Sequence, residues 1–381
     1  MSHHSSPRLQ LESLERRDCP AINYFLDGLG NITVTGVPDP AGLVVTVAAP
    51  NTYTIQNGAN TVLDGLSIPG GLTIRTGGSN DTVTVSVESG ALIGGNVFID
   101  TGAGTDGVEI LGANALTSTI LGNVNISGIN TGFPNAVDSV TVGGFVQINN
   151  FQENDGITFD LLSSIVGNDF FINTGNGTDV VTINESTVGG QAFVQLGNSL
   201  GGIQTFSVTS GATVGRNLTV LAGNLDDSVV LSGTIGGSAY VNLGNSLLSN
   251  TLAFNTGSTI GGQFTYIGGN GIDNLDTFAG SIGGSVFVNL MGGASNNVDF
   301  TGSMFGRSFV VLGGSGVDTF SLGATAAAPL ASFYASFGAG DDTVTLDVYP
   351  FTRLFVNLGS GNNDFNQPAG VVLLFATVLN A

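Results

Sequence analysis

The sequence predicts an all-β fold in which the chain winds as a repetitive solenoid, and two observations lead to this prediction. Aromatic residues recur at a fixed spacing of 47 residues, at Phe193, Tyr240, Phe287 and Tyr334. Each 47-residue unit also divides into two similar halves, and each half ends in a Gly-Gly pair or its substitute, as at 236–237. A short period sustained over many copies is typical of a solenoid, in which each repeat contacts only its neighbours.

Each half-unit contains three apolar runs. The first two alternate apolar with polar residues, which predicts strands with one inward face. The third is short and ends in Ile or Val before the glycines. The inward positions are Val97/Ile99, Phe170/Ile172, Val241/Leu243, Val286/Val288/Leu290 and Phe309/Val311 in the first run; Val83/Val85, Val108/Ile110, Ile157/Phe159, Val181/Ile183, Phe320/Leu322 and Val344/Leu346 in the second; and Val188, Val214, Ile235, Ile260 and Ile282 in the third.

The half-unit is the expected coil. Its marks run from residue 70 to residue 352 in twelve intervals with a mean of about 23.5 residues. Three short strands joined by glycine and Asn/Asp turns make one coil, and the expected winding sense is right-handed. We therefore expect a right-handed parallel β-helix of about 13 coils, with three short strands per coil.

The chain divides into four segments. Residues 1–22 hold three of the seven arginines and predict a flexible leader. Residues 23–69 have a blurred period interrupted by Pro38, Pro40 and Pro50, and we expect irregular coils that cap the array. Residues 70–369 form the repeats. Residues 370–381 predict a C-terminal apolar strand or cap.

Charge limits the choice of partner. The net charge is −21, and the 381 residues include seven arginines and no lysine. Nucleic acid is not expected as a partner because phosphate binding needs a basic face, and acidic polysaccharides and anionic membranes are disfavoured for the same reason. No apolar run reaches the roughly 20 residues of a membrane-spanning helix. Cys19 is the single cysteine, so no disulfide framework is expected.

One repeat position is acidic or amidic in nearly every coil. Asp or Asn at a turn commonly bonds nearby backbone N–H groups, which is the structural reading of this column. Two carboxylates roughly 5 Å apart repel by about 3 kcal/mol at an effective dielectric of 20, so a run of acids needs solvent, protonation or a cation. Calcium is the natural cation for such oxygens. The column comprises the metal candidates Asp81, Asp106, Asp138, Asp155, Asp179, Asp273, Asp318 and Asp342, together with Gln204, Asp227, Asn250 and Asn296.

Two turns support calcium in part. The segments 268–276 and 313–321 resemble the calcium-binding nonapeptide of repeats-in-toxin proteins, in which an Asp carboxylate and glycine carbonyls hold the ion. The two copies begin 45 residues apart, so they are not tandem. No cofactor is expected to be required, and calcium remains a candidate.

A second column points outward from the first strand and is aromatic. An exposed aromatic stripe flanked by amides is suited to a neutral glycan, a surface protein or a second copy of the chain. The structural alternatives are a covering loop or rings that stack on one another. The stripe comprises Phe98, Phe171, Phe193, Tyr240, Phe287, Tyr334 and Phe355, beside Asp100, Asn149, Asn173, Gln195, Asn242, Asn289 and Asn357.

No catalytic set stands out. The only histidines are His3 and His4, which removes His-based triads and ordinary zinc sites from the rest of the chain. The doublets at 226–227 and 341–342 are the obvious acid–base pairs, but adjacent strand residues point to opposite faces. The chain is therefore predicted not to be an enzyme.

The period and pattern over about 70–365 resemble the right-handed parallel β-helix proteins of bacterial surfaces and secretions, and residues 11–21 resemble a leader found on large secreted bacterial repeat proteins. The resemblance implies an extracellular or cell-surface, non-enzymatic rod, structural or adhesive, that binds glycan or a surface protein and can self-associate through its coil ends. The alternatives are a β-helix polysaccharide lyase or hydrolase and a calcium-dependent secreted repeat protein.

Overall fold

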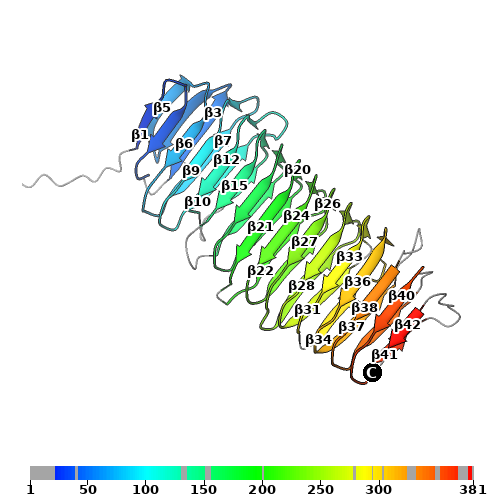
Figure 1. Cartoon of the computed structure of the whole chain (residues 1–381). Helices are drawn as coiled ribbons and strands as arrows, with labels where there is room; N and C mark the ends of the chain where they lie inside the picture. Colours follow the sequence, from blue (N-terminus) through cyan, green and yellow to red (C-terminus); the bar gives the residue numbers. More distant parts are fainter. Residues whose placement is uncertain are drawn as a thin grey trace, which may run out of the picture.

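The computed structural model describes residues 22–38, 42–129, 135–150, 156–199, 201–277, 280–293, 295–302, 304–323, 332–347, 352–367 and 376–379. Every regular element in these residues is a β-strand, and the strands stack into an elongated rod (Figure 1). The predicted leader falls almost entirely on residues 1–21, which lie outside the described residues. The all-β solenoid expected from the repeats is confirmed.

Three sheets run along the rod. Sheet A has 16 strands in spatial order: β1 (Asn23–Leu26), β2 (Ile32–Thr35), β6 (Leu72–Arg75), β9 (Val97–Asp100), β12 (Val124–Ser127), β15 (Val146–Asn149), β18 (Phe170–Asn173), β21 (Ala192–Gly197), β24 (Leu218–Ala222), β27 (Ala239–Asn242), β30 (Phe264–Ile267), β33 (Val286–Asn289), β36 (Ser308–Leu312), β38 (Ser332–Ser336), β40 (Leu354–Asn357) and β42 (Ala376–Leu379).

Sheet B also has 16 strands: β41 (Asp364–Asn366), β39 (Thr343–Leu346), β37 (Val317–Leu322), β34 (Ser295–Asp299), β31 (Ile272–Thr277), β28 (Ser249–Phe254), β25 (Asp227–Leu231), β22 (Gln204–Val208), β19 (Val180–Asn184), β16 (Thr158–Leu162), β13 (Ala136–Asp138), β10 (Gly107–Gly112), β7 (Thr82–Val87), β3 (Leu43–Ala49), β4 (Thr52–Asn57) and β5 (Asn60–Ser67). Sheet C has ten two-residue strands: β35 (Met304–Phe305), β32 (Ser281–Ile282), β29 (Thr259–Ile260), β26 (Thr234–Ile235), β23 (Thr213–Val214), β20 (Thr187–Val188), β17 (Ile165–Val166), β14 (Thr141–Val142), β11 (Thr119–Ile120) and β8 (Leu92–Ile93).

One coil contributes one strand to each sheet in turn, and each strand pairs in parallel with its equivalent in the next coil. From β6 onward, paired residues lie between 21 and 27 positions apart, as between Leu218 and Ala239 or Val97 and Val124. The coils average about 24 residues, as predicted, but the stack comes to about 11 turns rather than 13. Among the described residues, the strands after β35 belong to sheets A and B only.

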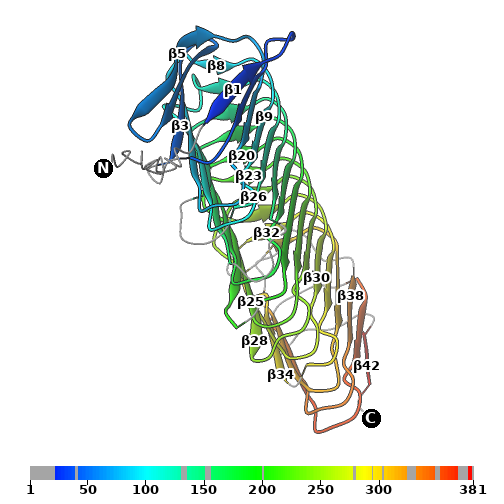
Figure 2. The ribbon, with the colours of Figure 1, turned by 90° about the vertical axis from the view of Figure 1, so that its left-hand side faces the viewer.

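The N-terminal end of the rod departs from parallel stacking (Figure 2). Strands β2 and β3 continue sheets A and B in parallel with β6 and β7. Beyond them, β1 pairs antiparallel with β2, and β3, β4 and β5 form an antiparallel meander. Antiparallel strands at a sheet end interrupt the parallel template that another coil would extend.

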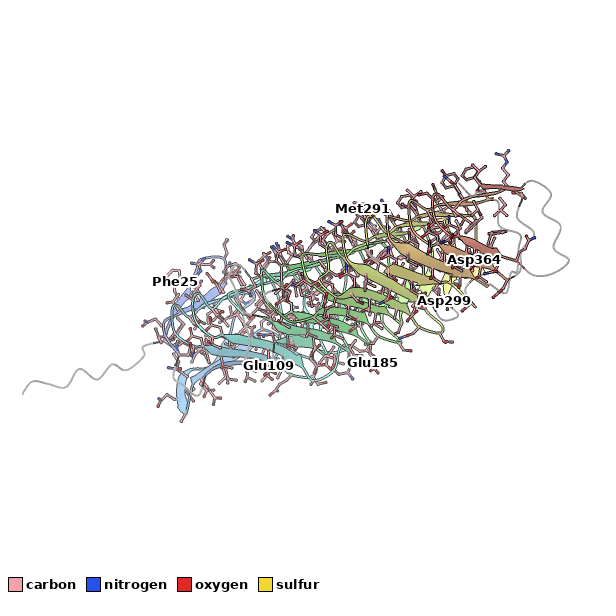
Figure 3. The ribbon with its side chains drawn as sticks, turned by 90° about the horizontal axis from the view of Figure 1, so that it is seen from below. Phe25, Glu109, Glu185, Met291, Asp299 and Asp364 are labelled. Atoms are coloured by element: carbon pink, nitrogen blue, oxygen red, sulfur yellow. The ribbon has the colours of Figure 1, made fainter. Side chains whose placement is uncertain are left out.

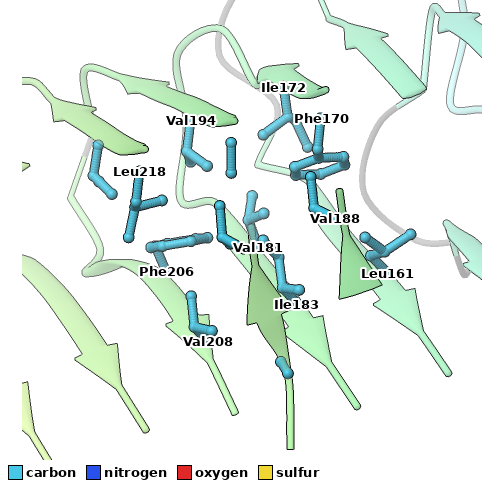
Figure 4. Close-up of a cluster of buried hydrophobic side chains, with 14 of the residues drawn as sticks. Leu161, Phe170, Ile172, Val181, Ile183, Val188, Val194, Phe206, Val208 and Leu218 are labelled. Carbon is cyan, nitrogen blue, oxygen red and sulfur yellow. The ribbon is translucent and has the colours of Figure 1, made fainter. Parts of the chain in front are cut away.

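The apolar core fills the space between the three sheets (Figure 4). Every inward position predicted from the alternation is buried, from Val83 and Val97 to Val344 and Leu346. Phenylalanine rings contact one another in the core of the C-terminal half. Phe309 packs edge-on against Phe300 and Phe320 at centroid distances of 4.9 and 5.3 Å. Stacked aliphatic and aromatic columns of this kind hold neighbouring coils together.

The Gly-Gly pairs let successive coils approach closely at the corner after sheet C. The Gly261 N–H donates to the Ile235 carbonyl at 2.8 Å, and the Gly262 N–H donates to the Gly237 carbonyl at 2.7 Å. A methyl group on Gly261 would overlap the Gly236 carbonyl oxygen, and one on Gly236 would overlap that of Gly215. The recurring glycine therefore reflects a lack of room for any side chain.

Candidate functional site

The predicted aromatic stripe lies in one row on the outer face of sheet A. Strand register aligns Phe171 with Phe193 directly, and it aligns Thr219 with Tyr240, Thr265 with Phe287, and Val310 with Tyr334. We call this the aromatic row: Thr73, Phe98, Asn125, Gln147, Phe171, Phe193, Thr219, Tyr240, Thr265, Phe287, Val310, Tyr334 and Phe355.

A second outward row lies two residues further along each strand. We call it the amide row, because seven of its members carry a carboxamide or, at one end, a carboxylate. Its members are Asp100, Ser127, Asn149, Asn173, Gln195, Leu221, Asn242, Ile267, Asn289, Leu312, Ser336 and Asn357. The two predicted columns are thus neighbours on one surface.

This surface is uncharged over most of its length. Between β12 and β40, neither the aromatic row nor the amide row contains an Asp, Glu, Arg or Lys residue. Several acidic residues of the rod lie instead on sheet B; Glu109, Asp299 and Asp364, for example, extend from its strands (Figure 3). A protein with a net charge of −21 therefore keeps these two rows neutral between β12 and β40.

The rings of the row differ in their surroundings. Tyr334 and Phe355 stack on each other, with centroids 4.9 Å apart and planes 9° apart. Phe171 meets Phe145 edge-on at 6.5 Å. Tyr240 is 37% exposed, and Thr219 and Thr265 occupy the row on either side of it. Ring stacking, one of the structural alternatives, thus applies at the C-terminal end of the row.

A shallow groove of about 230 Å³ opens where two ring-bearing coils are adjacent. Phe171 and Phe193 supply its apolar part. The Asn173 carboxamide oxygen accepts from the Gly175 N–H at 3.1 Å, which leaves the NH2 group of Asn173 as a donor. The remaining polar lining consists of Gln147, Asn149 and Gln195.

A second depression, of about 340 Å³, lies on the same face near the N-terminal end. Phe98 lies in it together with Asn96 and Asn125, and the Arg75 guanidinium lies 5.6 Å from the Phe98 ring centroid. Asp27 forms its acidic side, and hydrogen bonds from the Asn31 side chain and backbone hold the pKa of that carboxyl below its ordinary value.

The predicted acidic column is buried inside the rod. Six of its members accept a backbone N–H group of the preceding coil through a carboxylate or amide oxygen, as Asp106 Oδ1 does from Asp81 at 2.7 Å and Asp342 Oδ1 from Asp318 at 2.9 Å. We call it the buried acid column, and its described members are Asp81, Asp106, Asn135, Asp179, Gln204, Asp227, Asn250, Asp273, Asn296, Asp318 and Asp342. This is the backbone-bonding role that Asp and Asn often take at turns.

Acids alternate with amides through the middle of this column, as the sequence indicated. The Asn296 NH2 group donates to Asp318 Oδ1 at 2.7 Å, and the Asn250 NH2 group donates to Asp273 Oδ1 at 3.3 Å. The buried Tyr266 hydroxyl also donates to Asp273 Oδ1, at 2.8 Å. Asn250 and Asn296 thus each separate two carboxyl groups and donate a hydrogen bond to the next one, whereas the Gln204 NH2 group donates to the Gly177 and Leu196 carbonyls.

Burial shifts the proton affinity of the carboxyl groups upward. Loss of hydration raises the pKa of Asp106, Asp179, Asp273 and Asp342 to about 6. The pKa of Asp227 rises to about 8, because burial is joined by the nearby charge of Asp226. Neither Asp227 oxygen has a hydrogen-bond partner among the described protein atoms.

Two of the residues predicted for the column, Asp138 and Asp155, are not among its described members. Asp138 is not in it: Asn135 takes that position and accepts the Val108 N–H at 3.0 Å, whereas Asp138 pairs with Leu162 on the outer face. Asn135 stands two positions before Val137, and Asp138 stands two positions before Val140, so the sequence pattern fitted either residue. The structure selects Asn135, because Val137 is the inward residue of β13. Asp155 lies outside the described residues.

Asn363 continues the column and was not expected from the sequence. Its carboxamide oxygen accepts the Asp342 N–H at 2.7 Å, in the manner of the other members. The signal was present, since Asn363 stands two positions before Phe365, which packs against the core.

The calcium-like turns direct N–H groups at their carboxylates. The Gly314 N–H donates to Asp318 Oδ2 at 3.0 Å, and the Gly269 N–H donates to Asp273. Within the described residues, no three His, Cys, Asp or Glu side chains gather in an arrangement that could hold a metal ion.

The acidic doublets point apart. Asp226 Oδ1 accepts the N–H groups of Leu247, Leu248 and Ser249 at 2.8 to 3.1 Å, while Asp227 is buried in the column. Asp341 Oδ1 likewise accepts the exposed Asn362 N–H at 2.8 Å, while Asp342 is buried. Neither doublet presents two carboxylates to one surface.

No helix in the described part of the chain is long and apolar enough to cross a membrane. Comparison with protein-family models, with curated proteins and with solved structures found no match to this chain.

Proposed function

We propose that this chain is a non-enzymatic, extracellular or cell-surface rod that binds neutral glycan through the outer face of sheet A. The observation that carries the proposal is the groove in which Phe171 and Phe193 lie beside Gln147, Asn149, Asn173 and Gln195. The location rests on the resemblance of the leader and of the repeats to secreted proteins.

The groove has the two kinds of group that sugar recognition requires. The C–H face of a pyranose is apolar and packs on an aromatic ring, while its rim of hydroxyl groups pairs with donors and acceptors. A carboxamide supplies both a donor and an acceptor, and four carboxamides surround the two rings. Ligand sites generally combine apolar walls with a few placed polar groups in this way.

Charge favours a neutral sugar. Around the groove the aromatic and amide rows carry no charged residue, so neither an anionic nor a cationic sugar would find a counter-charge there. The net charge of −21 would also repel an anionic polysaccharide as it approached the rod.

The test is a neutral-glycan array followed by calorimetric titration with the best-bound sugar. We expect binding to the unaltered protein, and a loss of about tenfold or more in affinity for Phe171→Ser and for Phe193→Ser, because each removes one aromatic contact. Gln195→Glu keeps the shape of that side chain and removes its two amide donors, so it too is expected to weaken binding.

Val180→Ser is the matched control. Val180 faces outward from β19 in sheet B, so this change also removes an apolar side chain from the surface of the rod but leaves the groove intact. Circular dichroism would establish that all four variants keep the β-solenoid. Equal loss in the control and the groove variants, or no neutral glycan bound at all, would contradict the proposal.

A further inference from the structure

We infer that the glycan is an extended β-linked polysaccharide that lies parallel to the rod axis, with one disaccharide for every two coils. This inference rests on the proposed function and specifies its ligand. It comes from a period of two coils that the outer face of sheet A carries beyond the groove.

In the aromatic row, a ring occupies every second coil from β21 to β38. Phe193, Tyr240, Phe287 and Tyr334 hold these positions, and the coils between carry Thr219, Thr265 and Val310. Strands in a sheet stack about 4.8 Å apart, so successive rings are about 9.6 Å apart along the rod.

The amide row repeats with the same period and the same phase. Gln195, Asn242 and Asn289 lie on the ring-bearing coils, whereas Leu221, Ile267 and Leu312 lie on the coils between. The face is therefore built from a two-coil unit, in which one coil offers a ring and an amide and the next offers a small side chain and an aliphatic one.

An extended β-1,4-linked chain has a matching periodicity. Each sugar is turned over relative to the one before it, so the same pyranose face and the same hydroxyl edge recur at every second sugar. A pair of coils is about as long as one such disaccharide. Each ring would then pack on an equivalent sugar, and each amide would meet an equivalent hydroxyl group.

Charge argues against the other occupant with this periodicity, a second copy of the rod. Two copies facing each other would each bring a net charge of −21, whereas a neutral polysaccharide brings none. The neutral rows continue from the groove at Phe171 to Phe355, eight coil steps of about 4.8 Å, which is room for about four disaccharides.

The experiment is titration calorimetry with neutral oligosaccharides of two to eight sugars. Three β-1,4-linked series would serve, built from glucose, mannose and N-acetylglucosamine, and α-1,4-linked glucose oligomers would supply the same sugar in a curved chain. We expect at least one β-linked series to gain about tenfold or more in affinity between the disaccharide and the octasaccharide, because linked subsites add avidity. The α-linked series should show no comparable gain.

Single substitutions test which residues supply the gain in affinity with chain length. Tyr240→Ser and Phe287→Ser should weaken the octasaccharide several-fold more than they weaken the disaccharide, since the groove at Phe171 and Phe193 still binds a disaccharide in these variants. Val180→Ser should affect neither ligand. Light scattering of the unliganded protein establishes whether the face is already occupied by a second copy.

The possible outcomes distinguish failure of the axial polysaccharide inference from failure of the proposed glycan-binding function. Disaccharide binding that depends on Phe171 and Phe193 but does not strengthen with chain length leaves the glycan function standing and overturns the axial polysaccharide. An equal gain for the α-linked series overturns the extended shape. Dimers that Tyr240→Ser dissociates would assign the face to a second copy, and no binding in any series would remove both proposals.

Discussion

Replacing Asp227 by Asn is expected to stabilise the protein at neutral pH. The pKa of this buried carboxyl is raised from 3.8 to about 8, so the folded state holds a proton that the unfolded chain releases above pH 4. A raised pKa gives stability that is complete below pH 3.8 and is lost as the pH rises toward 8. The penalty that an always-neutral side chain would avoid is about 4 kcal/mol at pH 7 and approaches about 6 kcal/mol above pH 8, at 1.36 kcal/mol per unit.

An amide also suits this position sterically and chemically. The Gln204 carboxamide oxygen, in the coil before, is buried without a hydrogen-bond partner among the described atoms, and Gln204 is aligned with Asp227. The introduced Asn side chain would bring an NH2 group that can donate to this acceptor in the preceding coil, whereas Asn250 and Asn296 donate to carboxylates of the following coil. The substitution therefore removes a titrating group and adds a donor.

The assay is urea unfolding followed by circular dichroism at pH 4, 7 and 8.5. The unaltered protein should lose stability across this range, and D227N should be similar to it at pH 4 and more stable by up to about 4 kcal/mol at pH 7. Asp160→Asn, the same change on the outer face of β16, is the control and should shift stability by no more than about 0.5 kcal/mol. Parallel pH profiles for D227N and the unaltered protein, or a less stable D227N at pH 7, would refute the reasoning.

Three further results are expected. Gly236→Ala should lower stability by about 1–3 kcal/mol, because a methyl group there overlaps the coil before, whereas Gly28→Ala, with open space around it, should change thermal unfolding by no more than about 0.5 kcal/mol. Asn296→Asp places four acids in succession, since Asp273, Asp318 and Asp342 already flank residue 296, and it removes the donor to Asp318; it should cost about 3 kcal/mol at pH 7, and most of that loss should disappear when unfolding is measured at pH 4. A chelator should leave the melting temperature unchanged, because backbone N–H groups already bond the column carboxylates, and a fall of several degrees would instead assign calcium to the native state.

The alternation of the sequence was sufficient to predict which side chains fill the rod and which face outward. Val97 and Ile99 are buried and Phe98 between them faces outward, because a strand has a side-chain period of two. A shift of one residue in the strand phase would expose a whole column of apolar side chains to solvent. The aromatic and amide rows followed from the same rule. The spacing between successive Gly-Gly pairs, each of which precedes a sheet A strand, predicted the number of residues in a coil.

The acidic column was located by sequence but its burial was not anticipated. Asp81 stands two positions before Val83, so the period that turns Val83 inward turns Asp81 inward as well. Solvent, protonation and a cation all remained open as ways to offset the repulsion between neighbouring carboxylates, and the strand phase was not applied to the position of the column. The irregular coil near residue 135 allowed two phases, and only the pairing of Val137 with Ile110 decides between Asn135 and Asp138.

The alternation of acid with amide has a consequence for how this molecule can change length. Removing the single coil 239–263 would bring Asp227 onto Asp273 and two aliphatic members of the amide row, Leu221 and Ile267, onto each other. Removing the 47 residues 239–285 would instead seat Asp227 beside Asn296 and keep every ring in step. Between Gln204 and Asp318, the gain or loss of a pair of coils therefore keeps both alternations in step, whereas the gain or loss of a single coil breaks them.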